Sequence, residues 1–142
     1  MDNEVVVTKV EVVSGDVIAV PFHGTVAAGA RLTLTSKIIG FKYKTKRFRV
    51  SFPLNTNRTL RVSFHICPDE STPKTAEPVG DNVFTPYGQA TYVVGDDEVK
   101  DYDLEMLVNS EGTFLKVHGY NLDSFEHTID CAIFIERVRE GV

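Results

Sequence analysis

Apolar and polar residues alternate with a period of two along most of this chain, which is typical of β-strands. In residues 48–54 and again in 60–66 every even position is apolar, so each segment has one apolar and one polar face. The other predicted strands are short, rich in β-branched or aromatic residues, and bounded by Gly, Pro, Asn or Asp. Together, the predicted strands are residues 5–13, 25–35, 37–44, 47–54, 60–67, 92–94, 99–108, 113–120 and 128–138.

This pattern predicts an all-β fold. No apolar period of 3.6 persists for three turns, so no long helix is expected. A chain of 142 residues can form one substantial core and is short for two, and nine Phe and five Tyr residues supply that core. We therefore predict a single domain over residues 1–142, an antiparallel two-sheet sandwich that is jelly-roll-like and has about eight or nine strands.

The longest predicted connection, residues 68–90, holds four of the six prolines and two glycines. Connections of this length without secondary structure are uncommon in compact domains and often functional. It would carry the chain from one sheet to the other. Near its end, Phe84 and Tyr87 are candidate contact residues, either as anchors that hold the loop to the body or as an exposed contact surface. We expect anchoring, because exposed aromatic side chains lower solubility.

The two segments with apolar even positions predict an antiparallel hairpin joined by residues 55–59. Its polar face would place Arg49 across from His65, with both side chains toward solvent. The predicted pairs are Leu54 with Leu60, Phe52 with Val62, Val50 with Phe64, and Phe48 with Ile66.

A break in the alternation lies just before this segment. Phe41 and Tyr43 are apolar at odd positions, whereas the apolar residues from Phe48 onward are even. A turn or β-bulge within residues 45–47 would reconcile the two phases. With that bulge in place, all the cations of the stretch stay outside, namely Lys42, Lys44, Lys46, Arg47 and Arg49.

The charge of the chain is unevenly distributed. Residues 17–68 contain no acidic residue and nine of the fifteen cations, although the net charge of the whole chain is −5. In residues 99–108, three acidic side chains occupy one face. This acidic segment would either neighbour the basic one in the same sheet or meet it in a head-to-tail contact between subunits. The candidate interaction surface consists of Lys42, Lys44, Lys46, Arg47, Arg49, Arg61, Asp101, Asp103 and Glu105.

The sequence predicts no catalytic, cofactor-binding or metal site. Its four histidines are scattered, and it lacks GxSxG, HExxH, P-loop and GxGxxG patterns. His65 and Cys67 share one strand face, but we expect a solvent-facing histidine there. The acidic residues after Gly95 are interpreted as a polar turn, with calcium binding as the alternative. Cys67 and Cys131 have no metal-binding spacing and are expected to be free, buried thiols.

Composition also narrows the partners and the compartment. The chain is acidic overall, has no Trp and shows no nucleic-acid-binding motif, which argues against a nucleic acid. Its first residues are acidic instead of basic, and no apolar run approaches the roughly 18 residues of a membrane span. We therefore expect cytoplasmic synthesis without a signal peptide, and no membrane partner.

These observations favour a noncatalytic structural or adhesive β-sandwich that self-associates or docks on a larger protein assembly. A virion component, such as a capsid decoration, coat or tail protein, has this architecture and size, although fold alone does not establish function. The alternative is a carbohydrate-binding module in which Tyr and Phe stack on sugar rings. An enzyme on a cupin-like barrel is a third reading, disfavoured because the histidines are not spaced as its ligands.

Overall fold

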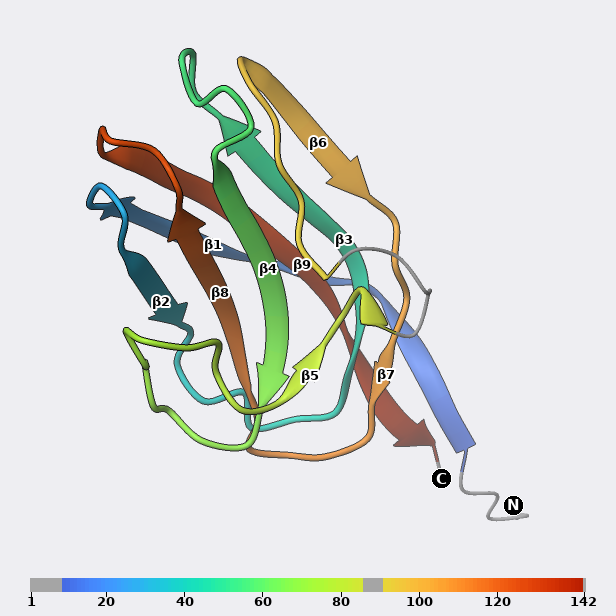
Figure 1. Ribbon diagram of the computed structural model, residues 1–142. Coiled ribbons are helices and arrows are strands. Elements are labelled where there is room, and N and C mark those ends of the chain that lie inside the picture. Colours follow the sequence, from blue (N-terminus) through green and yellow to red (C-terminus); the bar gives the residue numbers. More distant parts are fainter. Residues whose placement is uncertain (1–8, 86–90, 142) are drawn as a thin grey trace, which may run out of the picture.

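Two antiparallel sheets pack face to face in the computed structural model, which describes residues 9–85 and 91–141 (Figure 1). Sheet A has the order β1-β9-β3-β6, with β7 also beside β3, and sheet B has the order β2-β8-β4-β5. The strands of sheet A are β1 (Lys9–Val26), β9 (His127–Gly141), β3 (Tyr43–Phe52), β6 (Glu98–Tyr102) and β7 (Leu107–Val108). Those of sheet B are β2 (Arg31–Thr35), β8 (Phe114–Asn121), β4 (Leu60–Cys67) and β5 (Asp81–Asn82). The predicted all-β sandwich is confirmed, and apart from the two-residue β7 the strand order is that of a jelly roll.

The core lies between the sheets and is built from the apolar faces that the alternation indicates. Phe48 of β3 and Phe64 of β4 are fully buried, with ring centroids 5.1 Å apart. Where β8 passes over β9, a side chain at Gly119 would place its Cβ 2.4 Å from the Cδ1 atom of Ile129. Any larger residue at that position would therefore force the Ile129 side chain to move within the core.

The predicted hairpin between β3 and β4 is wrong. β3 pairs with β9, β6 and β7 in sheet A, whereas β4 pairs with β8 and β5 in sheet B. Residues 53–59 cross between the sheets, with φ values of 72°, 50° and 60° at Asn55, Asn57 and Arg58. The alternation of apolar and polar residues determines which face of each strand is buried. It does not determine which other strand pairs with it in the sheet. Both apolar faces are buried equally well when they oppose each other across the core.

The predicted bulge is confirmed in β3. Thr45 lies opposite Ile135 and Arg47 opposite Phe134, so Lys46 is the extra residue. Acidic segment 99–108, expected as one strand, is divided into β6 and β7 beside this bulge.

Thr45 bridges that division with its side chain. Its hydroxyl donates to the carbonyl of Leu104 at 2.7 Å and accepts from the amide of Met106 at 2.8 Å. These two side-chain hydrogen bonds thus take the place of the backbone hydrogen bonds between strands that the bulge interrupts.

Replacing Thr45 with Val is expected to lower the free energy of unfolding by about 2 kcal/mol, because an isosteric side chain leaves the Leu104 carbonyl and the Met106 amide without their partner. Urea unfolding measures the change. Thr25→Val, at an exposed position of β1, is the matched control and should change stability by less than about 0.5 kcal/mol. Equal effects of the two substitutions would contradict the bridging role.

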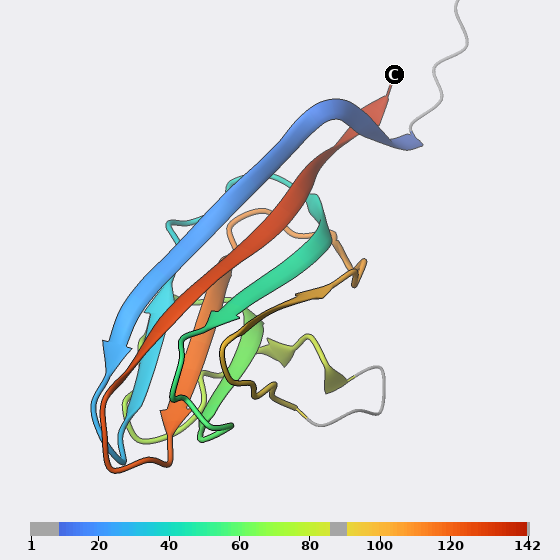
Figure 2. The same cartoon turned by 90° about the horizontal axis from the view of Figure 1, so that it is seen from above.

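β1 is longer than predicted. Gly15 and Pro21 interrupt its alternation, so only residues 5–13 and the segment from residue 25 were predicted as strands. In the structure β1 pairs with β9 from Lys9 to Val26, with an irregularity between Val12 and Val17. Figure 2 shows the two strands continuing together as a ribbon beyond the other strands of the sandwich.

The long connection is partly ordered by strand pairing and by anchoring. β5 lies within it and pairs with His65 and Ile66 of β4. Phe84 is buried, with its ring 6.0 Å from Phe64 and 5.6 Å from Tyr102, so its predicted role as an anchor is confirmed. Tyr87, the other candidate, lies outside the described residues.

Candidate functional site

The basic and acidic candidate residues meet on the outer face of sheet A, in the same chain. We call the set Lys44, Lys46, Arg47, Arg49, Asp101 and Glu105 the charged ladder. Asp101 lies opposite Arg49 in the β3–β6 pairing, and its Oδ1 atom is 3.0 Å from the Nε of Arg49 and 3.7 Å from that of Arg47. Glu105 is 2.6 Å from the Nζ of Lys46 and 3.9 Å from that of Lys44.

These ion pairs shift the titration of their members. The hydrogen bond from Lys46 lowers the pKa of Glu105, and the same bond raises the pKa of Lys46. Each pair is exposed, and exposed ion pairs contribute little to stability. Their consequence is instead that each of these four cations has an acidic partner within the chain. The four cations share two carboxylates, so the positive charge of β3 is compensated in part.

Three candidate residues stand apart from this ladder. Lys42 is half-buried just before β3, and its carbonyl accepts from the amide of Val138. Asp103 is exposed between β6 and β7. Arg61 lies in sheet B, where its guanidinium stacks on the ring of Tyr92 at 4.5 Å. The predicted surface is therefore divided between the two outer faces of the sandwich.

The outer face of sheet B carries a buried polar patch. Strand pairing brings together Thr33 of β2, His118 of β8 and Ser63 of β4 in one row, and Lys116 and His65 in the next. All five side chains are buried although they point away from the core. Residues 68–80, which we call the roof loop, run from the end of β4 toward the β2 side and back to β5, and they cover this patch (Figure 1).

The roof loop is tied down at three places. Its Pro73 carbonyl accepts a hydrogen bond from the hydroxyl of Thr33 at 2.8 Å. The Nζ atom of the buried Lys116 donates to Asp69 at 3.2 Å and to the carbonyl of Ser71. The two bonds from Lys116 compensate its buried positive charge, which would otherwise destabilise the protein.

His118 belongs to a chain of hydrogen bonds whose direction can be assigned. Because the hydroxyl of Thr33 donates to Pro73, it accepts from the Nδ1–H of His118 at 2.7 Å. The Nε2 atom of His118 then accepts from the Nη1 of Arg31 at 3.1 Å. Burial and the charge of Arg31 lower the pKa of His118 to about 4, so the ring is neutral at pH 7.

The expectation of a solvent-facing His65 is wrong. Its side chain is 1% exposed because β5 and the roof loop lie beside it. His65 lies opposite Lys116 and Asn82 instead of Arg49. Its Nε2 atom is 2.8 Å from the hydroxyl of Ser63, and its Nδ1 atom has no hydrogen-bond partner in the part of the chain that the structure describes. Burial, with His118 and Lys116 nearby, lowers the pKa of His65 to about 4.

A pocket of about 170 Å³ opens beside this patch, lined by Arg31, Arg61, Ser63, Glu77, Thr91, Tyr92, His118 and Tyr120. Arg31 lies over the ring of Tyr120 at 3.9 Å, as Arg61 does over Tyr92. Sequence reasoning missed this pocket. The only signals were Ser63 and His65 on a strand face and the proline-rich connection that follows them, and neither distinguishes a covered face from an exposed one.

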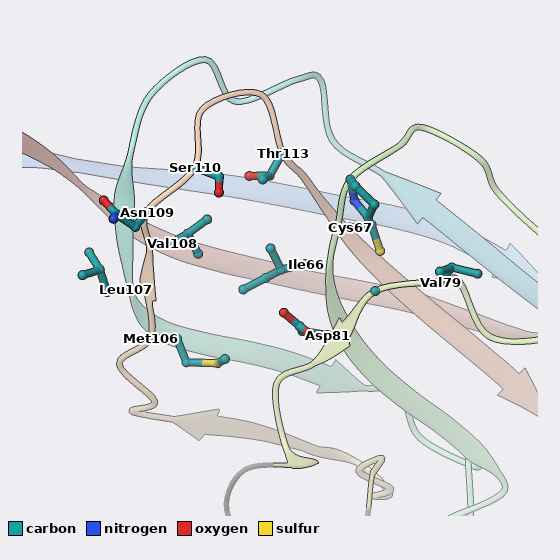
Figure 3. A pocket seen from close by; sticks show the side chains of 12 residues that line it. Ile66, Cys67, Val79, Asp81, Met106, Leu107, Val108, Asn109, Ser110 and Thr113 are labelled. Atoms are coloured by element: carbon teal, nitrogen blue, oxygen red, sulfur yellow. The ribbon is translucent and has the colours of Figure 1, made fainter.

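A second hollow, of about 510 Å³, lies between the ends of β4 and β7. Figure 3 shows Asp81, Asn109 and Ser110 around it, with Met106 and Leu107 along one side. Cys67 lines this hollow too, but its thiol is buried and burial raises its pKa, which disfavours the reactive thiolate. Within residues 9–85 and 91–141, no group of three or more His, Cys, Asp or Glu side chains could hold a metal ion.

The free edge of sheet A is a third feature. β1 pairs with β9 on one side, and no strand of the described chain pairs with its other side. From Val17 to Val26 it has no Asp, Glu, Lys or Arg. At the opposite edge, β6 is only five residues long and includes Glu98, Lys100 and Asp101.

Comparisons with known proteins add nothing to this geometry. Comparison with family models, curated proteins and solved structures gave no match. In the part of the chain that the structure describes, no helix has the length and hydropathy of a membrane span.

Proposed function

We propose that this chain is a noncatalytic structural β-sandwich that self-associates by pairing the free edge of β1 with the same edge of a second copy. The observation that carries the proposal is the edge itself. β1 is 18 residues long and its last ten residues carry no Asp, Glu, Lys or Arg. Exposed sheet edges are normally protected by charged residues or short length, because their unpaired N–H and C=O groups recruit other strands.

The side chains along β1 support the same conclusion. Val17 and Ile18 are 50% and 41% exposed, which gives the edge an apolar margin. Pro21 is the one residue between Val17 and Val26 of the type that protects edges. Antiparallel pairing of two identical edges is self-complementary, so it closes as a two-fold dimer.

The charged ladder argues against self-association through opposite charges on two subunits. Lys44, Lys46, Arg47 and Arg49 have acidic partners within the chain, so a head-to-tail contact would compete with these pairs. We therefore favour edge pairing over charge pairing as the means of assembly.

The finer assignment, to a virion coat, decoration or tail component, remains part of this proposal. Jelly-roll sandwiches include capsid subunits, lectins and cupins, so the topology by itself does not choose among them. Neutral-sugar binding by stacking is less favoured, because a guanidinium covers one face of both Tyr92 and Tyr120.

Analytical ultracentrifugation over a range of concentrations tests the edge pairing. The wild-type chain is expected to form a dimer that persists at about 0.5 M NaCl, where ion pairs are strongly screened. The double substitution Val17→Lys/Ala19→Lys places charge at exposed positions of the edge and should weaken dimerisation by tenfold or more.

Val99→Lys is the matched control, because Val99 is 56% exposed on β6, at the opposite edge of sheet A. It should leave the dimer intact. A wild-type chain that stays monomeric at every concentration would contradict self-association. A dimer that V99K disrupts and V17K/A19K does not would place the interface elsewhere.

A further inference from the structure

We propose that the pocket between Arg31 and Arg61, on the outer face of sheet B, binds a small oxyanion: the carboxylate, sulfate or phosphate group of a small polar ligand. This site lies on the sheet opposite to the β1 edge and does not depend on self-association.

The first argument is charge. Within residues 9–85 and 91–141, no carboxylate lies within ion-pair distance of Arg31 or Arg61, whereas the arginines of the charged ladder are both paired. Both side chains are half-buried. Glu77 is the one acidic residue that lines the pocket, so the two half-buried guanidiniums leave an excess of positive charge there, which favours an anion from solution.

The second argument is geometry. Arg31 and Arg61 both pair with Tyr120, one from each side, so their side chains leave the same face of the sheet in one row. Adjacent strands are about 4.8 Å apart, which separates the two backbone positions by roughly 10 Å. Long side chains starting at that separation can both reach a ligand held between them.

The third argument is that Arg31 is held in place before any ligand arrives. Its guanidinium stacks on Tyr120 and donates to His118, whose ring is fixed through Thr33 to the roof loop. Arg61 is restrained by stacking on Tyr92. A donor that is already oriented loses less conformational entropy on binding, which increases affinity.

The residues at the bottom of the pocket and its volume limit the size and the chemistry of the ligand that it can hold. Ser63 and His118 are each 2% exposed and line the pocket from below. A volume of about 170 Å³ equals the share of roughly five or six water molecules in the liquid, which suits one anionic group and a small body attached to it. Glu77 lines the same pocket and can accept a hydrogen bond from a ligand hydroxyl.

The test is a titration followed by NMR of the full chain, with inorganic phosphate, sulfate, glucuronate and, as the neutral control, glucose. We expect saturable shifts at the amides of Ser63, His118 and Tyr120 with at least one anion and none with glucose. Arg31→Gln and Arg61→Gln should each weaken binding by about tenfold or more, since each removes charge-assisted hydrogen bonds.

Arg49→Gln is the matched control, because Arg49 is an exposed arginine of sheet A that already has a carboxylate partner. It should leave anion binding unchanged. Among residues 9–85 and 91–141 the Arg61 side chain has no hydrogen-bond partner, so the effect of Arg61→Gln can be read even if Arg31→Gln perturbs folding.

The anions distinguish the source of the ligand. Binding of phosphate or sulfate with an affinity equal to that of glucuronate would indicate a site for an inorganic ion or a simple ester, and preference for glucuronate would indicate an acidic sugar. The proposal is overturned if no anion gives saturable shifts at these amides, if glucose binds as well as glucuronate, or if only R49Q weakens binding.

Discussion

Lowering the pH from 7 to about 4 is expected to destabilise the fold by several kcal/mol, chiefly through His65 and His118. Both rings are buried and neutral, and burial lowers the pKa of each from 6.5 to about 4. The unfolded chain therefore takes up protons near pH 6.5, while the folded chain resists them until about pH 4. Between these values the unfolded state binds more protons, so stability falls as the pH falls.

The magnitude follows from the two pKa values. A shift from 6.5 to about 4 corresponds to about 3 kcal/mol for each histidine. The groups around the rings oppose protonation, because Arg31 faces His118, and Lys116 lies beside His65. Glu77 of the roof loop is 4.0 Å from His65 but is half exposed, so it offsets this repulsion only weakly.

Urea unfolding at a series of pH values between 7 and 4 measures this loss. NMR titration of the two imidazoles provides the direct check, with the urea-unfolded chain as the control in which both should titrate near pH 6.5. The double variant His65→Gln/His118→Gln should flatten the pH dependence of stability in this window. Folded-state titration of both rings near pH 6.5 would show that the patch is open to water.

Replacing Phe64 with Ala is expected to lower the free energy of unfolding by about 4 kcal/mol, because it removes a fully buried aromatic ring and leaves a cavity. Phe64 contacts Phe48 of sheet A across the core, and Phe84 of the long connection also packs on it. The substitution therefore weakens both the packing of the two sheets and the anchoring of the connection.

The matched control is Phe125→Ala, which removes the same ring from a position that is 71% exposed. It should change the free energy of unfolding by less than about 0.5 kcal/mol. Urea unfolding gives both values. A loss below about 1 kcal/mol for F64A would mean that the two sheets do not share the tight core described above.

Alternation predicted the inward side chains of β3 and β4 correctly, and the phase break predicted the bulge at Lys46. Both are local features, because side-chain direction and bulges depend on a few consecutive residues. The charges allowed two arrangements of the acidic and basic segments, either as neighbours in one sheet or in a contact between subunits. The structure places them side by side in one chain.

The polar patch under the roof loop could not be predicted in the same way. Ser63 and His65 occupy the polar positions of an alternating strand, which in most sandwiches face water. Their burial depends on β5 and the roof loop returning over the sheet, a long-range contact that no nearby residue signals. Arg61 similarly belongs to the pocket with Arg31 because β2 and β4 flank β8, and not because of its neighbours in sequence.

By itself the sequence determined the all-β class, the inward face of most strands and the concentration of positive charge in residues 17–68, since composition and periodicity are properties of the chain. Only the tertiary structure decided that β3 and β4 lie in opposite sheets and that the cations of the charged ladder have acidic partners within the chain. It also decided that Arg31 and Arg61 share a pocket in which neither forms an ion pair with a described residue. Strand pairing is the reason for this difference: it joins residues far apart in the sequence, and many pairings bury the same apolar faces equally well.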